Sequence, residues 1–425
     1  MKTQHGPFEG KWRLRTMAGA GMLFMPLASQ ASDLLWAGRD RGPSPAESLH
    51  RRDAGFMEPR HAVYASTGDA HTFQRSISQR NDTAVEASSV SRVLPDERVA
   101  YAARRRDVGN ETQIAAHVTA STALFDYGGR MNDGLHQRLG EIRNVMPTND
   151  LGGEVFVRYS GSQINVTPGP GSQAGYGFKQ QANALQLGGS VVTWNQEGSN
   201  LRAGWAYDQG EVRVTPKKSD LGSTFYKAKG MSAWLTAQRD NGLYVDVVAG
   251  NRRFNGRIND GAGRASPKVR ASGWVTSVEA GLPMALTESL SIEPQGQITY
   301  QSLRINPIQN ASGLITRSSG RSQQTTARIG VRISKIDNER FVPYMKVDFS
   351  KQFAGHSKIS SFDADKGIDA TFDSVRTGTS MGLSAGMTIK VNRVVDFYAD
   401  AGMQRHLGGR GANGFAGNAG LRINF

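Results

Sequence analysis

The sequence predicts an all-β fold: a 12-stranded antiparallel transmembrane β-barrel with an N-terminal α-helix threaded through its pore, preceded by a largely irregular segment. Three observations lead to this prediction. Apolar and polar residues alternate in many short segments, twelve such segments follow residue 151, and every second connection between them is tight. The last segment is the clearest, because Ala419, Leu421, Ile423 and Phe425 share one face of a strand and Asn418, Gly420, Arg422 and Asn424 share the other.

The composition limits the classes of protein that fit. Only 38% of the 425 residues are apolar, and no run approaches the roughly 18 apolar residues that a membrane-spanning helix needs. A bundle of membrane helices is therefore excluded, whereas a barrel carries its apolarity in alternation. The 50 glycines suit tight turns, and the absence of cysteine excludes a disulfide framework. The net charge of +14 is compatible with nucleic-acid binding, but the motifs point elsewhere and we expect no nucleic-acid partner.

Residues 1–31 are predicted to be a signal peptide, because basic residues come first, an apolar stretch follows and small residues come last. The basic residues are Lys11, Arg13 and Arg15, and the apolar stretch covers 17–27. Ser29 and Ala31 form a small-x-small cleavage site before Ser32. We therefore expect transfer by the Sec export machinery; an amphipathic or disordered N-terminus is the alternative.

Residues 32–113 are predicted to be a short passenger or linker, mostly irregular. This segment has scattered arginines balanced by acids, few large aliphatic residues and no sustained period. Such a composition buries too little apolar surface to build a core.

Residues 114–150 are predicted to contain a pore helix and a linker. Leu135, Leu139 and Ile142 are spaced by four and three residues, which places them on one helix face. The remaining candidate pore-helix residues are polar and are expected to meet the lumen wall: His136, Arg138, Glu141 and Arg143. Four glycines between 128 and 140 each cost about 1 kcal/mol in a helix, so the helix needs surroundings to hold it. A surface helix between two domains is the alternative.

Residues 151–425 are predicted to form the barrel, since about 9–11 residues are enough for a tilted strand to cross a bilayer. The twelve predicted strands are 153–162, 182–194, 201–214, 226–238, 242–254, 269–282, 290–303, 325–336, 341–353, 378–391, 394–406 and 414–425.

The predicted inward faces carry the candidate lumen residues. In 290–301 the inward set is uniformly polar, and the outward set is mostly apolar. The candidate lumen residues are Glu279, Glu293, Gln295, Gln297, Arg328, Asp400 and His406. The charged residues that we expect to pair with each other and with the helix are Glu279, Glu293, Arg328, Arg332, Lys346 and Asp348. A soluble β-sandwich would show the same local alternation, so alternation by itself does not decide between the two.

The connections favour the barrel, because tight and long links take turns. The tight links are 195–200, 239–241, 283–289, 337–340 and 392–393, and the long links are 163–181, 215–225, 255–268, 304–324 and 354–377. Outer-membrane barrels have short turns on the periplasmic side and long loops outside. The link 407–413 is a short exception. Basic residues near the long links are expected to contact lipopolysaccharide phosphates: Lys217, Lys218, Arg264, Lys268, Arg317 and Arg321.

These features resemble a known family. Residues 114–425 are similar to the translocator domain of autotransporters of the pertactin-like group of type V secretion, through Leu-His-Gln-Arg-Leu-Gly-Glu-Ile-Arg at 135–143, Leu-Gln-Leu-Gly-Gly at 185–189, Ile-Glu-Pro-Gln-Gly-Gln at 292–297, Pro-Tyr at 343–344 and Asn-Ala-Gly-Leu-Arg-Ile-Asn-Phe at 418–425. The resemblance implies a 12-stranded barrel in the outer membrane of a Gram-negative bacterium, with a helix in its pore. It also implies that the barrel assembly machinery reads a C-terminal signal that includes Leu421, Ile423 and Phe425.

The chain departs from that family before the helix. Members usually carry a β-helical passenger of several hundred residues, whereas only about 80 residues, 32–110, precede the predicted helix here. Without an apolar repeat to stack coils, we expect no β-helix in this segment. The Asn-Asn pair that some members use for cleavage inside the pore is also missing from 128–143.

Catalytic and cofactor motifs are weak. Gly-Arg-Gly-Ala-Asn-Gly at 409–414 matches a dinucleotide fingerprint, but it joins two strands and is read as a hairpin turn. His406 shares its strand face with Asp400 and Gln404, which predicts a lumen hydrogen-bond network rather than a catalytic base. No zinc or calcium spacing is present, so we predict no catalytic site, cofactor or metal.

The predicted function is an outer-membrane translocator that exports or displays its own short N-terminal segment at the cell surface. The first alternative is a surface adhesin or host-interaction protein, whose extracellular loops bind a host or matrix ligand. A small porin or a barrel hydrolase that depends on His406 is the second.

Overall fold

The computed structural model describes residues 95–140, 153–169, 176–196, 198–259, 267–338, 340–363 and 368–425. The predicted signal peptide, with Ser29, Ala31 and Ser32, lies outside the described residues, as does the passenger segment up to residue 94. In the part of the chain that is described, no helix is both long and apolar enough to cross a membrane.

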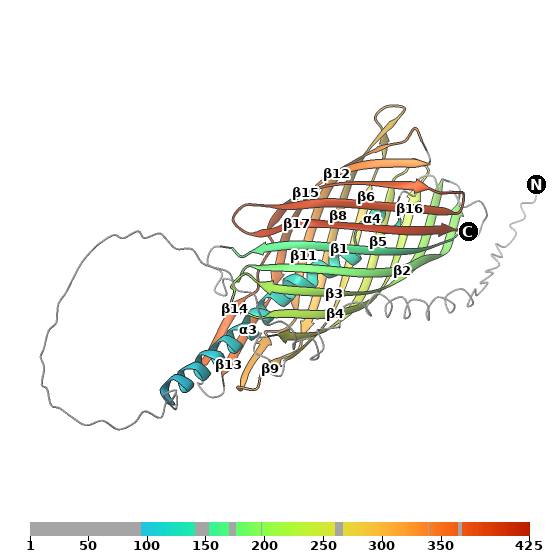
Figure 1. The fold of residues 1–425 in the computed structure, drawn as a ribbon. Coiled ribbons are helices and arrows are strands. Elements are labelled where there is room, and N and C mark those ends of the chain that lie inside the picture. Colours follow the sequence, from blue (N-terminus) through green and yellow to red (C-terminus); the bar gives the residue numbers. More distant parts are fainter. Residues whose placement is uncertain are drawn as a thin grey trace, which may run out of the picture. The chain divides into compact units, whose positions relative to one another are not determined.

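Twelve long antiparallel strands close into a barrel, which confirms the predicted fold (Figure 1). They are β1 (Glu154–Thr167), β2 (Phe178–Gln196), β3 (Ser199–Pro216), β4 (Ser223–Arg239), β5 (Tyr244–Asn259), β6 (Lys268–Gly281), β8 (Leu290–Ile305), β11 (Ser322–Lys335), β12 (Phe341–His356), β15 (Thr379–Lys390), β16 (Val395–Leu407) and β17 (Gly411–Asn424). Each strand pairs with its neighbours, and β1 closes the ring against β17 from Glu154↔Asn424 to Thr167↔Gly411. No strand edge of the barrel is therefore left open.

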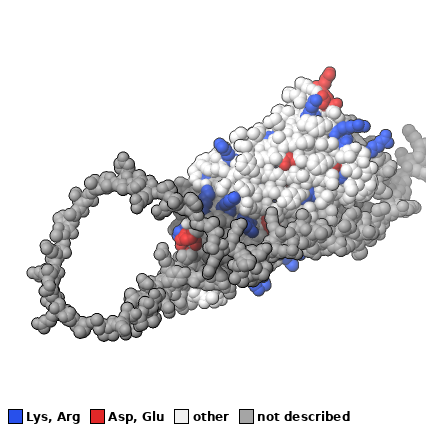
Figure 2. All heavy atoms as spheres, viewed as in Figure 1, with Lys and Arg blue, Asp and Glu red and all other residues white. Residues whose placement is uncertain are grey.

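The outer wall is apolar over its middle. On β5, every second residue from Val245 is exposed, and exposed large apolar residues recur at the same height on other strands, for example Val278 and Ile298. Figure 2 shows one face on which few charged atoms interrupt this band, with Lys and Arg gathered mainly toward its two ends. A wall of this kind is stable in contact with lipid and not with water.

Tight turns lie at one rim, and the long links lie at the other together with the short link between β16 and β17. One turn contains the two-residue β7 (Met284–Ala285). Two long links, predicted as loops, instead form a second sheet in the order β14–β13–β10–β9. Its strands are β9 (Ile308–Gln309), β10 (Leu314–Ser318), β13 (Lys358–Asp363) and β14 (Ile368–Asp373). The buried side chains of Ile308, Leu314 and Ile359 explain why these segments leave water.

Two helices of the described residues come before β1 in the chain, and they lie inside the ring of strands except for the first part of the longer one, which extends beyond the barrel (Figure 1). The helix α3 covers Pro95–Met131 and α4 covers Leu135–Leu139. The predicted pore helix is confirmed, but α3 begins well before residue 114 and the helix is interrupted at 132–134. Residues 98–106 are rich in Ala and Arg, which favour helix without needing an apolar period, whereas Gly134 and its polar neighbours favour a break. Glu141 and Arg143 lie outside the described residues.

The lumen has two tiers: the lower one carries the predicted polar residues beside a small apolar cluster, and the upper one is mainly apolar. Toward the long links, apolar side chains of α3 pack against inward residues of the wall, including Leu124, Ile164, Phe254 and Ile258. On β5 the inward set changes from Asp246 near the tight-turn rim to Phe254 and Ile258 farther up, while the outward set changes from Val245 to Arg257. The alternation persists but its apolar face moves from outside to inside, because the upper wall contacts the helix and not lipid.

Candidate functional site

The site is the contact between the helices and the barrel wall. Its lowest part is a buried ion pair, in which Arg138 Nη2 donates to both carboxylate oxygens of Asp246 at 2.9 Å. The Thr236 hydroxyl donates to the same carboxylate at 2.5 Å. The guanidinium also lies 5.0 Å from the ring centre of Trp234. Both charged side chains are almost fully buried, so each depends on the other for its stability.

A second anchor joins α4 to β8. His136 Nε2 lies 2.8 Å from Glu293 Oε1, and the same carboxylate accepts hydrogen bonds from Gln295 at 2.9 Å and Arg332 at 3.4 Å. The packing of Leu135 and Leu139 against Phe156, Trp234 and Tyr244 fixes this side of the helix.

Glu279 holds the start of α4. Its carboxylate accepts hydrogen bonds from the backbone N–H of Leu135 at 3.2 Å and from the Tyr244 hydroxyl at 2.8 Å. Arg328 donates to Glu279 at 2.6 Å and to Gln297 at 2.9 Å. The structure therefore brings together the predicted residues Glu279, Gln297 and Arg328 beside the helix, and Glu293 and Gln295 on the neighbouring stretch.

Sequence reasoning missed Arg158, which lies on the inward face of β1 and is fully buried. Its guanidinium donates to the Gln137 carbonyl at 2.9 Å, to the Met131 carbonyl at 3.4 Å and to the Gln186 side chain at 2.8 Å. The Met131 carbonyl lies at the end of α3 and the Gln137 carbonyl lies near the end of α4, so Arg158 satisfies backbone oxygens that the two helix ends leave without helical partners. The available signal was an arginine between two lipid-facing residues, Val157 and Tyr159.

The end of α4 is held by the last strands. Arg422, also missed, donates to the Leu139 carbonyl at 2.5 Å and to Asp396 at 2.6 Å. The Tyr398 hydroxyl donates to the Arg138 carbonyl at 2.8 Å. On the other face of β17, the predicted signal residues Leu421, Ile423 and Phe425 are exposed on the outer wall.

The middle of the helix pair is fixed by a third network. Arg252 on β5 donates to Asp208 at 2.8 Å and to the Asn132 side chain at 2.7 Å. The Tyr127 hydroxyl of α3 donates to the same Asp208 at 3.2 Å. These contacts immobilise the residues at the helix break.

Above the barrel, the second sheet holds α3. Gln113 donates to the Ile308 and Leu314 carbonyls at 2.9 and 3.2 Å. His117 Nδ1 lies 3.1 Å from the Thr316 hydroxyl and Nε2 lies 2.9 Å from the Ser318 hydroxyl. Burial lowers the pKa of His117 to about 4, so the imidazole is neutral at pH 7.

Of the basic residues predicted to bind lipid phosphates, Lys218 has a protein partner. It lies 2.5 Å from Glu111 of α3, and this hydrogen bond raises the pKa of Lys218. Arg317 lies on β10 and is exposed, as are Lys217, Lys268 and Arg321, whereas Arg264 lies outside the described residues.

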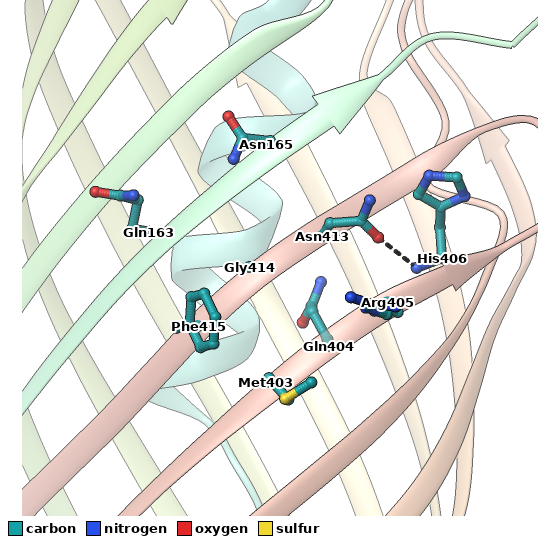
Figure 3. A pocket seen from close by; sticks show the side chains of 9 residues that line it. All are labelled: Gln163, Asn165, Met403, Gln404, Arg405, His406, Asn413, Gly414 and Phe415. Atoms are coloured by element: carbon teal, nitrogen blue, oxygen red, sulfur yellow. Dashed lines mark hydrogen bonds between the residues drawn. The ribbon is translucent and has the colours of Figure 1, made fainter.

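The structure separates the residues that were expected to join His406. Asp400 accepts from Tyr344 at 3.1 Å and from Asn418 at 3.0 Å, whereas His406 Nδ1 donates to the Gly408 carbonyl at 2.7 Å. The reason is position, since His406 is at the end of β16. It lines a hollow of about 410 Å³ at the ends of β1, β16 and β17, where Asn413 accepts from its backbone N–H (Figure 3).

The chemistry of the site is binding. In the described ranges, no group of three or more His, Cys, Asp or Glu residues is placed to hold a metal ion. The charged residues of the lumen are instead engaged with each other and with the helix backbone. Such an arrangement defines a membrane barrel whose lumen is plugged by a helix of the same chain.

Comparison with known proteins gives the family. The family model for the autotransporter β-domain matches residues 155–402, which is more than half of the chain. The chain belongs to this autotransporter family, whose β-barrel domains lie in the outer membrane of Gram-negative bacteria.

Relatives and solved structures agree on the barrel. The serine protease EspP of Escherichia coli is 26% identical over 188 residues, which are 43% of this chain but only 13% of EspP. The transport unit of AIDA-I from Escherichia coli (14% identity, TM-score 0.55) and the translocator domain of NalP from Neisseria meningitidis (14%, 0.52) each match 73% of this chain and 99% of their own. The β-domain of Bordetella BrkA (18%, 0.50) matches 64% and 98%. These structures support the fold alone.

Proposed function

We propose that this protein is an outer-membrane translocator that exports or displays the segment preceding α3 at the cell surface. The path of the helices carries the proposal. The Leu139 carbonyl binds Arg422 near the tight-turn rim, whereas Asn110 accepts a hydrogen bond from Asn310 at 2.8 Å in a link beyond the opposite rim. The helix α3 therefore enters the lumen from the side of the long links, which in outer-membrane barrels is the outside, and this direction supports display of the preceding segment there.

The mechanism in this proposal is physical. The barrel supplies a path closed to lipid, and the helix remains in it as a plug once the segment ahead has crossed. The buried pairs at Asp246, Glu279 and Glu293 oppose further movement, because removal of the helix would leave these carboxylates without their helix partners.

Export also requires assembly, and here the proposal includes the Sec export machinery and the barrel assembly machinery as partners. Leu421, Ile423 and Phe425 lie on the outer wall of the strand that closes the barrel, where a protein that acts before closure could reach them. Their apolar side chains do little for the lumen, which supports a role in recognition.

The rival functions have less support. The apolar packing around α3 argues against a small porin. A hydrolase would need a base at His406, whose ring contacts a hairpin carbonyl. The serine-protease name of EspP describes a protein of which the matched region is 13%, so no activity is carried over. Ligand binding by the long links would act beside export, and the second sheet on that side is the surface to test.

An epitope inserted after Ser44 tests the proposal. Intact cells with inserted barrel are treated with an external protease, and a matched variant carries the epitope in the tight turn between Asn392 and Arg393. We expect the first epitope to be removed and the second to be protected until the outer membrane is opened. Protection of both epitopes in cells whose barrel is folded would overturn the proposal.

A further inference from the structure

A group of cations lies on the outer wall of three adjacent strands. Lys229 on β4, Arg253 and Arg257 on β5, and Lys268 and Arg270 on β6 are all exposed and share the outward parity of their strands. We call these five residues the basic wall. They are not part of the lumen, and the export mechanism does not use them.

The strand register places like charges opposite each other. Lys229 pairs with Arg253 across β4 and β5, and Arg257 pairs with Lys268 across β5 and β6. Side chains in such positions are about 5 Å apart at Cβ, and like charges there are destabilising. The other register partners of the basic wall are Gln209, Ser272, Phe225 and Asn255, so no carboxylate stands opposite any of the five. By contrast, the neighbouring Lys227 stands opposite Glu211.

The height of the basic wall is set by an aromatic pair. The rings of Trp274 and Tyr300 lie 5.0 Å apart on the outer wall, and exposed apolar residues such as Val278 and Ile298 lie below them toward the tight turns. Aromatic residues of this kind mark the edge of the hydrocarbon layer. Asn251 is in register with Trp274, so Arg253 is two residues and Arg257 six residues beyond that level. At about 3.4 Å per residue and about 40° of tilt, these cations stand roughly 5–16 Å outside the hydrocarbon edge.

The other side of the barrel lacks such a group. The corresponding outward residues beyond the apolar band are Gln163 and Asn165 on β1 and Asn413 on β17, and β16 has Arg405 alone. Single outward cations occur on other strands, at Lys179, Arg213, Lys351 and Arg405, but none of these is in register with another cation. The basic wall differs by its two like-charge pairs, which repeated phosphate groups in the outer leaflet would neutralise.

We propose that the basic wall binds the phosphate groups of lipopolysaccharide, the anionic lipid of the outer leaflet. Its cations lie at headgroup height and side by side, and arginine matches phosphate in geometry as well as in charge. A nucleic acid or an acidic protein fits this position less well, because the lipid headgroups themselves occupy the wall at that height.

The test uses the full folded protein in detergent and purified lipopolysaccharide as the probe. Four substitutions, Lys229→Gln, Arg253→Gln, Arg257→Gln and Arg270→Gln, remove charge from the basic wall. A control variant carries Lys179→Gln, Lys351→Gln and Arg405→Gln, which remove outward cations on other strands. Binding is measured at 0.15 M salt after heat-dependent gel mobility has shown that each barrel is folded.

We expect the four-substitution variant to bind lipopolysaccharide about 10- to 100-fold more weakly and the control to stay within about twofold, since each surface cation near an anionic membrane contributes about 1 kcal/mol. Lipopolysaccharide stripped of its phosphates should bind the parent protein and the four-substitution variant equally. Inorganic phosphate at millimolar concentration should not compete with intact lipopolysaccharide. Unchanged binding in the four-substitution variant, equal loss in the control, or equal binding of the stripped lipid would overturn the proposal. The epitope near Ser44 reports export separately, so the two proposals can fail independently.

Discussion

Replacement of Asp246 by alanine should loosen the helix in the lumen. In the parent protein Arg138 is fully buried and donates two 2.9 Å hydrogen bonds to Asp246. The substitution leaves this buried charge without its carboxylate partner. Breaking a buried ion pair from one side costs about 3–5 kcal/mol. The fraction of molecules with an undocked helix should then rise roughly 150- to 5,000-fold, at 1.36 kcal/mol per decade.

A single cysteine reports this equilibrium. The chain has no cysteine of its own, and Ala123 on α3 is fully buried in the upper tier. In an Ala123→Cys background, reaction with a maleimide is expected to require undocking, so its rate measures the undocked fraction. Single-channel conductance in a planar bilayer gives a second readout.

Two further variants make the experiment specific. The double substitution Arg138→Met and Asp246→Leu removes both charges and places two apolar side chains next to Trp234 and Tyr244. It should restore slow labelling to within about tenfold of the parent rate. Asp337→Ala removes the exposed partner of Lys335, a 3.0 Å pair, and should leave the rate unchanged. A parental labelling rate in the folded Asp246→Ala protein would refute the reasoning.

Three other predictions concern different parts of the molecule. Arg158→Ala should increase labelling at position 123 about 10- to 1,000-fold, because two helix carbonyls and Gln186 lose a charged donor; equal labelling would show that water replaces it. The pKa of His117 is lowered from 6.5 to about 4, so its contribution to helix docking is complete above pH 6.5 and is lost as the pH falls toward 4. Labelling should therefore rise over that interval and stay flat in His117→Gln, and a flat parent profile would contradict the assignment. Phe425→Ala should lower the outer-membrane yield while the melting temperature of the folded barrel changes little, since the ring is 64% exposed; a normal yield would remove the proposed signal role.

The strands were predictable because side chains of a strand alternate between its two faces whatever strand it pairs with. Predicted ends were often too early, as on β5, where 242–254 was predicted and the strand continues to Asn259. The cause is the change of apolar face: beyond the hydrocarbon edge Arg257 points outward and Ile258 points to the helix, so the expected pattern of apolar residues outside stops although the strand does not. The same reversal from Val157 to Ile164 on β1 was a readable sign of an apolar upper tier.

The lumen pairs were only partly predictable. Parity places Glu279 and Glu293 inside, but it says nothing about which helix residue stands at their height. Arg158 and Arg422 were missed for a related reason. Their partners on the helix are backbone carbonyls, which come within reach as acceptors only where a helix ends inside the barrel. The start of α3 could not be found from periodicity, since Ala-rich and Arg-rich sequence forms helix without an apolar stripe.

The three anchors on the helix also act as a gauge of position. Asn132, His136 and Arg138 reach partners on two strands at fixed heights, and the Leu139 carbonyl reaches a third strand. A shift of the chain by one helical residue moves every group by about 1.5 Å and turns it by about 100°, which is enough to break the 2.9 Å double hydrogen bond and all the other contacts together. Neighbouring positions therefore offer no partial compensation, and a chain that moves through this lumen has a single place at which it comes to rest.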